Sequence, residues 1–471
     1  MYRYRILFLS VYLFSVAVDV LPLADGNVVK TGTSDSARPN IVFLVVESTD
    51  GRTWTPGYQN DVIPMPNIRL LQENGTQFRR HYSNAPVCCP SRATFWSGRH
   101  ASNIPHEHDG IRVDGVWNNF EGLPSNFSDR MDQVLDRAGY QVKMSGKLDW
   151  STGDHSENVY LNAWTMNVRF PYDVNASGGW RDETVCADNA TITDDYEKER
   201  HSDWTTLHET ISWIEDTVKN ESSASSLAPF FAYQGMNIVH PAYVTNRYWS
   251  EKIDRGLIEV PHWRPLEELH PCDFQSSMLK GCTPSDADAQ AFYSVDRRRE
   301  IRAVYYAMIA EFDAMVGAYV DAVKRAGVFD RTVFIVVSDH GDMQMEKQQF
   351  YKMVPYEASA SVPMVIYDGR RQQGGVVVDA VPTQLIDIFP TVMDLATVPD
   401  ELRPNALDGY SLVPLIQPET ASEAPTTPRP DFVVSQFHGD NIAMSWFMAV
   451  KRVMRRTSDD AHFFKLVVWG T

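Results

Sequence analysis

Cysteine is scarce in this chain of 471 residues, which has only Cys88, Cys89, Cys186, Cys272 and Cys282. Five cysteines in a chain of this length exclude a scaffold held together mainly by disulfides, although Cys272 and Cys282 could close a short loop. The adjacent pair Cys88 and Cys89 needs another explanation.

An excess of basic residues is also missing. The chain has 43 Lys and Arg against 61 Asp and Glu, a formal net charge of −18. Nucleic acids and anionic membranes both favour basic faces, so neither is expected as a partner. The apolar content of 43% is sufficient for a sizeable core in one large domain or two unequal ones.

The apolar run near the N-terminus is too short to span a bilayer comfortably. Four aromatic and basic residues after Met1 lead into residues 6–18, which are almost without polarity. This pattern predicts a signal peptide at residues 1–24, with no stable membrane insertion after its cleavage. Glycosylation sequons agree with the secretory pathway, and hence with a lysosomal or secreted protein that passes through the endoplasmic reticulum. The asparagines of these sequons are Asn74, Asn126, Asn175, Asn189 and Asn220.

Continuous apolar runs alternate with helical periodicity along the chain. A run without polar alternation indicates a strand buried on both faces, and strands that alternate with helices indicate an α/β sheet. Such sheets bind their ligands at the carboxyl ends of the strands. The expected strands are 41–46, 229–233, 332–337 and 362–367, and the expected helices include 131–138 and 299–326.

Two of these strands end in acidic clusters, which marks the expected place of a cation site. Residues 47–50 read Glu-Ser-Thr-Asp, and residues 338–341 read Ser-Asp-His-Gly.

Towards the C-terminus, the Pro/Thr/Glu-rich segment 418–430 is typical of an exposed connector. Beyond it, possible strands at 432–437, 442–450 and 463–469 predict a small antiparallel subdomain at 431–471, expected to be incomplete. The sequence shows no internal repeat.

Residues 88–98 contain Cys-x-Pro-Ser-Arg followed by Ala-Thr-Phe-Trp-Ser-Gly. This segment resembles the signature of the sulfatase family, in which the first cysteine is oxidised to formylglycine (3-oxoalanine) by the formylglycine-generating enzyme. The resemblance extends from Pro39 to about Gln436 and implies an alkaline-phosphatase-like fold, with a mixed, mostly parallel sheet flanked by helices and a catalytic domain at 39–417. Further matching segments are 50–52, 117–120, 146–149, 305–308, 338–341, 349–353, 356–360 and 437–439.

The resemblance implies sulfate ester hydrolysis with formylglycine at Cys88 as the nucleophile. A hydrated aldehyde carries two hydroxyls, so one can attack sulfur while deprotonation of the other releases sulfate. Arg92 lies one turn beyond Cys88 if the motif opens a helix, and it is expected to hold the hydrate and its charge.

The resemblance also implies a Ca²⁺ ion bound by Glu47, oxidised Cys88, Asp339 and His340. The first ligand is usually Asp in the family, so Glu47 is a departure, and Asp50 is a possible substitute or a supporting neighbour. On the sequence alone, Glu47→Asp is expected to keep or raise turnover.

Positions that hold the sulfate in the family correspond to Lys147, His240 and Lys352, and Lys147 also counts among the expected catalytic residues. Lysine offers a point charge to an anion, and histidine can donate a proton to the leaving oxygen. His155 is the expected acid or base beside the hydrate. Lys347 stands where the nearest relatives have a histidine, which could alter the preference for a sugar.

The substrate implied by the resemblance is a sulfated carbohydrate, with the 2-O-sulfate of a terminal glucuronate in a glycosaminoglycan as the preferred candidate. Two alternatives stay open. One is a phosphoesterase of the same superfamily, and the other is a catalytically impaired, sulfatase-like protein that binds glycans.

Overall fold

The computed structural model describes most of the chain from residue 38 onwards. The predicted signal peptide, His155, Cys282 and most of the predicted connector lie outside the described residues. The undescribed segments are 1–37, 59–60, 109–110, 120, 152–183, 188–197, 222–227, 242, 265–267, 274–275, 277–292, 372–373, 418–428, 439–444, 455–460 and 471.

A seven-stranded sheet forms the core, with the strand order β12-β2-β11-β10-β1-β8-β6. The four adjacent strands β10, β1, β8 and β6 are parallel to one another, whereas β11 runs antiparallel to both of its neighbours, β10 and β2. The predicted α/β fold with a mixed, mostly parallel sheet is confirmed. The strands are β1 (Asn40–Val46), β2 (Thr76–Phe78), β6 (Gln141–Gly146), β8 (Phe230–Gly235), β10 (Thr332–Ser338), β11 (Met364–Asp368) and β12 (Val376–Val378).

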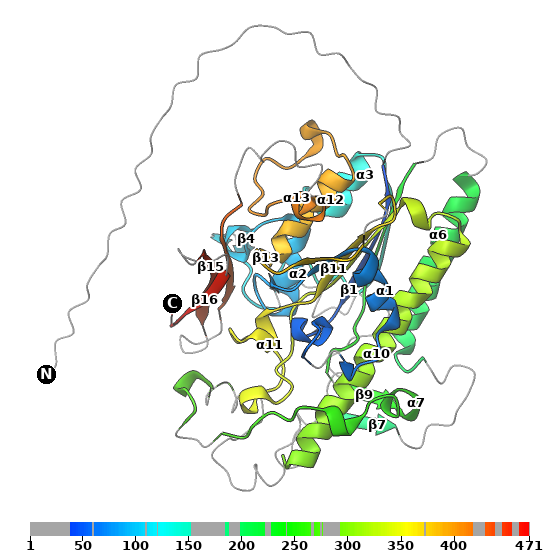
Figure 1. Ribbon diagram of the computed structural model, residues 1–471. Helices are drawn as coiled ribbons and strands as arrows, with labels where there is room; N and C mark the ends of the chain where they lie inside the picture. The colour runs from blue at the N-terminus through cyan, green and yellow to red at the C-terminus, as the bar shows by residue number, and fades with distance from the viewer. Residues whose placement is uncertain are drawn as a thin grey trace, which may run out of the picture. The chain divides into compact units, whose positions relative to one another are not determined.

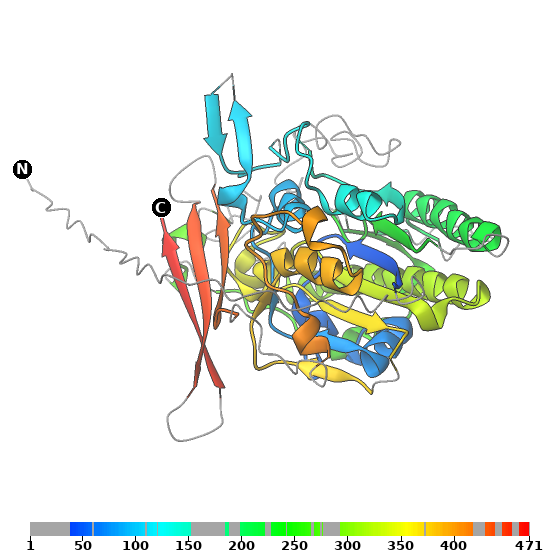
Figure 2. The same ribbon diagram turned by 90° about the horizontal axis from the view of Figure 1, so that it is seen from above.

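Helices cover both faces of this sheet (Figures 1 and 2). Alternate residues of β1 point to opposite faces of the sheet. The odd-numbered residues from 41 to 45 pack into one apolar cluster, and the even-numbered residues from 42 to 46 pack into the other. Since both faces are buried, the strand needs no polar alternation, as its sequence indicated. The first face carries α2 (Cys88–Ser97), α3 (Met131–Arg137) and α12 (Ile388–Leu395), and the second carries α1 (Pro66–Asn74), α6 (His201–Glu221) and α10 (Val295–Arg325).

A separate three-stranded antiparallel sheet stands at the C-terminal end, drawn in orange and red in Figure 2. Its strands are β14 (Phe432–Phe437), β15 (Trp446–Met454) and β16 (Ala461–Trp469), so the middle strand begins later than the expected 442–450. One side of the sheet packs against Val87, immediately before α2. The predicted antiparallel subdomain is confirmed, and it contacts the segment that carries the cysteine motif.

Several short elements complete the described fold. Cys272 is a free thiol, whereas Cys282, its suggested disulfide partner, lies outside the described residues. Within the described part of the chain, no helix is both long and apolar enough to cross a bilayer. The short strands and helices are β3 (His81–Tyr82), β4 (Pro105–His108), β5 (Ile111–Asp114), β7 (Thr184–Ala187), β9 (Tyr243–Asn246), β13 (Thr383–Gln384), α7 (Arg247–Ser250), α11 (Glu357–Ala360) and α13 (Val413–Ile416).

Candidate active site

Three segments meet at the carboxyl end of the central sheet. β1 and β10 are parallel with Val46 opposite Ser338, so the residues that follow, Glu47 and Asp339, emerge side by side. The third segment is the start of α2, whose first residue is Cys88. The backbone thus brings together the two acidic strand ends and the cysteine motif.

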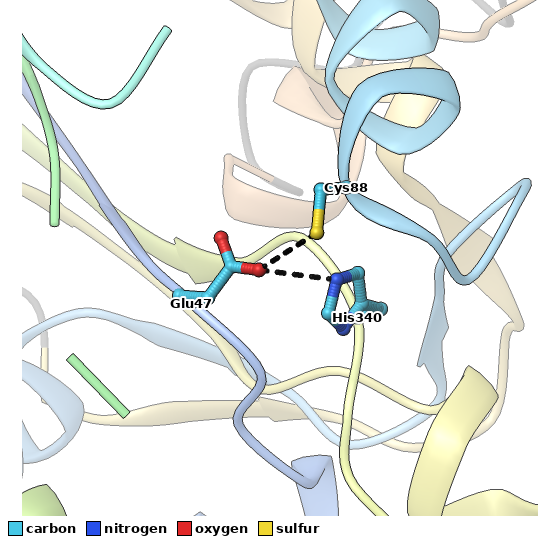
Figure 3. Close-up of side chains that lie close together, drawn as sticks. All are labelled: Glu47, Cys88 and His340. Carbon is cyan, nitrogen blue, oxygen red and sulfur yellow. Dashed lines mark hydrogen bonds and ion pairs between the residues drawn. The ribbon is translucent and has the colours of Figure 1, made fainter. Parts of the chain in front are cut away.

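Glu47, Cys88 and His340 form a fully buried cluster (Figure 3). Cys88 Sγ lies 3.1 Å from Glu47 Oε1, and His340 Nε2 lies 3.3 Å from the same oxygen. One ligand atom from each residue falls within 4.8 Å of the other two. Three of the four predicted metal ligands therefore converge closely enough to share one ion.

Asp339 lies beside this cluster, with its carboxylate fixed by neighbours. Its Oδ1 accepts hydrogen bonds from the backbone N–H groups of Ser48 at 3.1 Å and His340 at 2.9 Å. Its Oδ2 lies 3.7 Å from His340 Nε2. The fourth predicted ligand is thus adjacent, with one oxygen towards the shared site.

Arg92 is fully buried, and its guanidinium donates mainly to the carboxylates of the site. Nε donates to Asp339 Oδ2 at 3.0 Å, and Nη2 to Glu47 Oε2 at 2.8 Å. Nη1 donates to the Lys147 carbonyl and the Tyr233 hydroxyl, both at 3.0 Å. These contacts make Arg92 a counter-charge that holds two predicted metal ligands, and its expected hold on the hydrate stays a prediction.

Two lysines bring further positive charge. Lys147 Nζ lies 2.9 Å from Glu47 Oε2 and 3.2 Å from Asp149 Oδ2. Lys352 Nζ lies 3.8 Å from Glu47 Oε1 and 3.3 Å from His240 Nε2. The His240 Nδ1 contacts the Pro241 carbonyl, an arrangement that leaves Nε2 as acceptor for the lysine.

These charges shift the titration of the buried groups. Burial raises the pKa of Glu47, but Lys147 and Arg92 outweigh it and hold this pKa well below its usual range. For Cys88, burial and Glu47 oppose ionisation, yet the two lysines prevail and lower the pKa of the thiol. The site therefore stabilises negative charge, as a pocket for an anionic ester requires.

The donor set can be tested against a cation. A carboxylate, a thiol and an imidazole together are typical of zinc, whereas Ca²⁺ prefers oxygen ligands. An oxygen in place of the Cys88 sulfur would convert the set into one suited to a harder ion, with the Glu47 and Asp339 carboxylates at hand. The residues fit Ca²⁺ only together with oxidation at residue 88.

Other predicted residues lie elsewhere. His155 is outside the described residues, so its role stays a prediction. Asp50 pairs with Arg52, whose Nη2 lies 2.6 Å from Asp50 Oδ2, and Asp50 is not among the three residues of the cluster. Lys347 lies 4.3 Å from the ring centre of Tyr356 and 3.9 Å from Asp273 Oδ2.

Sequence reasoning assigned no role to Asp149, Tyr233 or Asn119. Asp149 is fully buried, pairs with Lys147 and has a φ of 45°, in the left-handed region that side chains rarely adopt. Asn119 accepts the Cys89 N–H at 3.1 Å, at the start of α2. Asp149 and Asn119 fall in matching segments, so the resemblance could have flagged them, but Tyr233 carries no such signal.

Comparison with known proteins agrees with this geometry. The Sulfatase family model matches residues 39–398. Arylsulfatase K of Bos taurus is 34% identical over 94% of this chain and 78% of its own length, and that of Homo sapiens is 36% identical over 87% and 72%. A phosphonate monoester hydrolase of Agrobacterium radiobacter shares the fold, with a TM-score of 0.65 at 20% identity over 92% of this chain and 89% of its own. The chain therefore belongs to the sulfatase family of sulfuric ester hydrolases, with arylsulfatase K among its relatives.

Proposed function

We propose that this sulfatase removes the 2-O-sulfate of a terminal glucuronate from a glycosaminoglycan, with formylglycine at residue 88 and a bound Ca²⁺. The observation that supports the proposal best is the buried cluster of Glu47, Cys88 and His340, with lysine and arginine groups around it. The choice of sugar rests on the resemblance seen in the sequence, whereas the arylsulfatase K relatives support only a sulfate ester as the class of substrate.

The residues of the chain divide the work of ester hydrolysis. When present, the formylglycine hydrate would supply an oxygen nucleophile, and Ca²⁺ held by Glu47, Asp339, His340 and residue 88 would offset negative charge. Lys147 and Lys352 face the Glu47 carboxylate and are proposed to bind the sulfate oxygens. They compensate charge that grows as the ester bond breaks.

Protonation of the departing alcohol is assigned to His240 and Lys352. His240 Nε2 lies 3.3 Å from Lys352 Nζ, so a proton can pass between the ammonium group and the imidazole. His155 is retained as a second proposed acid or base. Water supplies the oxygen that the sulfate gains, and the alcohol leaves with one proton.

The proposed route of the protein follows from its predicted signal peptide and sequons. The formylglycine-generating enzyme would modify Cys88 in the endoplasmic reticulum, before delivery to the lysosome or secretion. A lumenal or extracellular location also agrees with a sulfated glycan as the substrate.

The test compares secreted wild-type protein, Cys88→Ala and Cys89→Ala on 2-sulfoglucuronate oligosaccharides and on an aryl sulfate, at acid and neutral pH. Cys89 is the matched control, because its Sγ donates to the Asn119 carbonyl and the metal cluster does not include it. We expect both substrates to be cleaved, Cys88→Ala to lose all turnover and Cys89→Ala to retain it.

The other outcomes identify the alternatives. Cleavage of the aryl sulfate alone would leave the sugar assignment without support. Binding of sulfated glycans without turnover would indicate an impaired relative, and hydrolysis of phosphate monoesters in preference to sulfates would indicate a phosphoesterase.

Removal of the metal gives an independent prediction. Chelation with EGTA should abolish turnover, and added Ca²⁺ should restore it, because Ca²⁺ is the ion proposed to offset negative charge at residue 88 and on the bound ester. Restoration by Zn²⁺ but not by Ca²⁺ would contradict the proposed metal and point to an unoxidised thiol among the ligands.

A further inference from the structure

The turn at residues 236–240, which presents His240, continues the pairing between β8 and β1. Met236 N–H donates to the Val45 carbonyl at 2.9 Å. Glu47 N–H then donates to the Ile238 carbonyl at 2.9 Å, and Val239 N–H to the Glu47 carbonyl at 3.0 Å. The turn and the backbone of Glu47 therefore hold each other in place.

The opposite side of the turn is held by Asp203, in the first turn of α6. Asp203 Oδ1 accepts the Asn237 N–H at 3.0 Å, and Oδ2 accepts the Ile238 N–H at 2.9 Å. The residue is only 2% exposed. An acid in the first turn of a helix commonly interacts with that helix's own N-terminus, but here both oxygens bind a separate segment.

The start of α6 is itself anchored. Glu311 Oε1, on α10, accepts the Arg200 N–H at 2.8 Å and the Trp204 Nε1–H at 2.9 Å. Arg200 Nη2 also donates to the His240 carbonyl at 3.3 Å. These hydrogen bonds connect α10 to the start of α6 and from there to the turn.

We propose that Asp203 is a positioning residue for ester hydrolysis: it fixes the turn that places His240 beside Lys352. The inference rests on the proposed function for its effect on turnover. Asp203 itself does not contact the metal cluster, so it acts through the turn.

The test begins with Asp203→Asn. An asparagine retains one acceptor oxygen, but its NH₂ group faces a backbone N–H, so one of the two hydrogen bonds is lost. We expect kcat/KM for an aryl sulfate to fall about 10- to 100-fold, the scale on which small misplacements of reacting groups act.

Asp313→Asn is the matched control. Asp313 is another buried carboxylate that accepts two backbone N–H groups, those of Asn67 at 3.2 Å and Ile68 at 2.7 Å, at the start of α1. We expect both variants to lower the melting temperature, and only Asp203→Asn to lower kcat/KM. Equal activity of the two variants would overturn the proposal.

A double variant separates positioning from general weakening. If Asp203 acts through His240, then Asp203→Asn added to His240→Ala should reduce kcat/KM by no more than about twofold beyond His240→Ala alone, whereas independent effects would multiply. A multiplicative loss would overturn the proposal.

Hydrogen exchange measured by mass spectrometry reports on the turn without any substrate. Asp203→Asn should accelerate exchange at 236–240 and Asp313→Asn at 66–74, each without the other. If the wild type hydrolyses no sulfate ester, the proposed function fails while this measurement still decides whether Asp203 holds the turn. Unchanged exchange at 236–240 in Asp203→Asn would contradict the positioning role.

Discussion

Glu47 is the residue on which the site converges. Its Oε1 contacts Cys88 and His340, and its Oε2 contacts Arg92 and Lys147. Both oxygens are therefore engaged, and the surrounding groups are matched to the reach of a glutamate. The sequence alone favoured aspartate as the better residue here, but these contacts point the other way.

Glu47→Asp is accordingly expected to weaken Ca²⁺ binding by at least about tenfold, since a shorter acid cannot keep both sets of contacts. Titration calorimetry with Ca²⁺ and kcat/KM for an aryl sulfate measure the effect. Unchanged or tighter Ca²⁺ binding, with turnover at or above that of the wild type, would show that the pocket tolerates the shorter acid.

Asp149 is the second buried partner of Lys147. Asp149→Asn replaces a charged partner by a neutral one and should cost about 1.5–3 kcal/mol of folding free energy, as for other hydrogen bonds to charged groups. It should also raise KM for the aryl sulfate, because Lys147 loses its orientation. Thermal unfolding and steady-state kinetics test both effects, and unchanged stability together with an unchanged KM would refute them.

The sequence could predict the residues whose place follows from a motif or a strand end. Glu47, Asp339 and His340 directly follow buried strands, and Cys88 opens the signature. Asp203 could not be predicted, because its partners lie on a turn more than 30 residues along the chain.

At the scale of elements, the apolar runs of β1 and β10 predicted the central strands because burial on both faces leaves a clear pattern. The antiparallel direction of β11 leaves no such pattern in the sequence. The backbone conformation of segment 344–353, which delivers the predicted residue Lys352, was also beyond prediction. Several of its residues adopt positive φ without being glycine, among them Gln344, Met345 and Tyr351, so the usual sequence signal for such backbone is missing.

The C-terminal sheet supports the same segment. Trp446 of β15 is fully buried, and its Nε1–H donates to the Met353 carbonyl at 3.0 Å. Met353 N–H in turn donates to the Pro86 carbonyl at 3.1 Å, two residues before Cys88. The sheet therefore connects the Lys352 segment to the nucleophile segment, although the boundaries 39–417 and 431–471 stay predictions.

Trp446→Phe should cost about 1–3 kcal/mol through the lost hydrogen bond and lower kcat/KM for an aryl sulfate. Trp54→Phe is the matched control, a buried tryptophan that stacks on Phe312 of α10. Thermal unfolding and kinetics should show a loss of stability in both variants and a loss of activity only in Trp446→Phe. Equal activities would mean that the sheet does not support the site.

At the scale of the whole molecule, buried acids link stability to pH. Burial raises the pKa of Glu311 to about 8 and that of Asp313 to about 6. An acid with a raised pKa in the folded state favours folding most when protonated, so stability declines as pH rises from the ordinary glutamate value through about 8. These two acids should therefore contribute more stability at acidic pH than at neutral pH.

Glu311→Gln removes the part of this pH dependence of stability that comes from Glu311. Between pH 5 and 8, the wild type should lose up to a few kcal/mol of stability that the variant retains. Melting temperatures across this range test the prediction, with Glu300→Gln on the surface side of α10 as the control. A wild type and a Glu311→Gln variant with parallel pH profiles would refute it.

The most direct measurement of the central claim is the chemical state of residue 88 in secreted protein. Trypsin releases residues 81–92, and fragment masses distinguish Cys88 from Cys89. We predict a peptide in which residue 88 has exchanged sulfur for oxygen and lost two hydrogens, with turnover proportional to the converted fraction. Full turnover with an unmodified thiol at residue 88 would contradict the account.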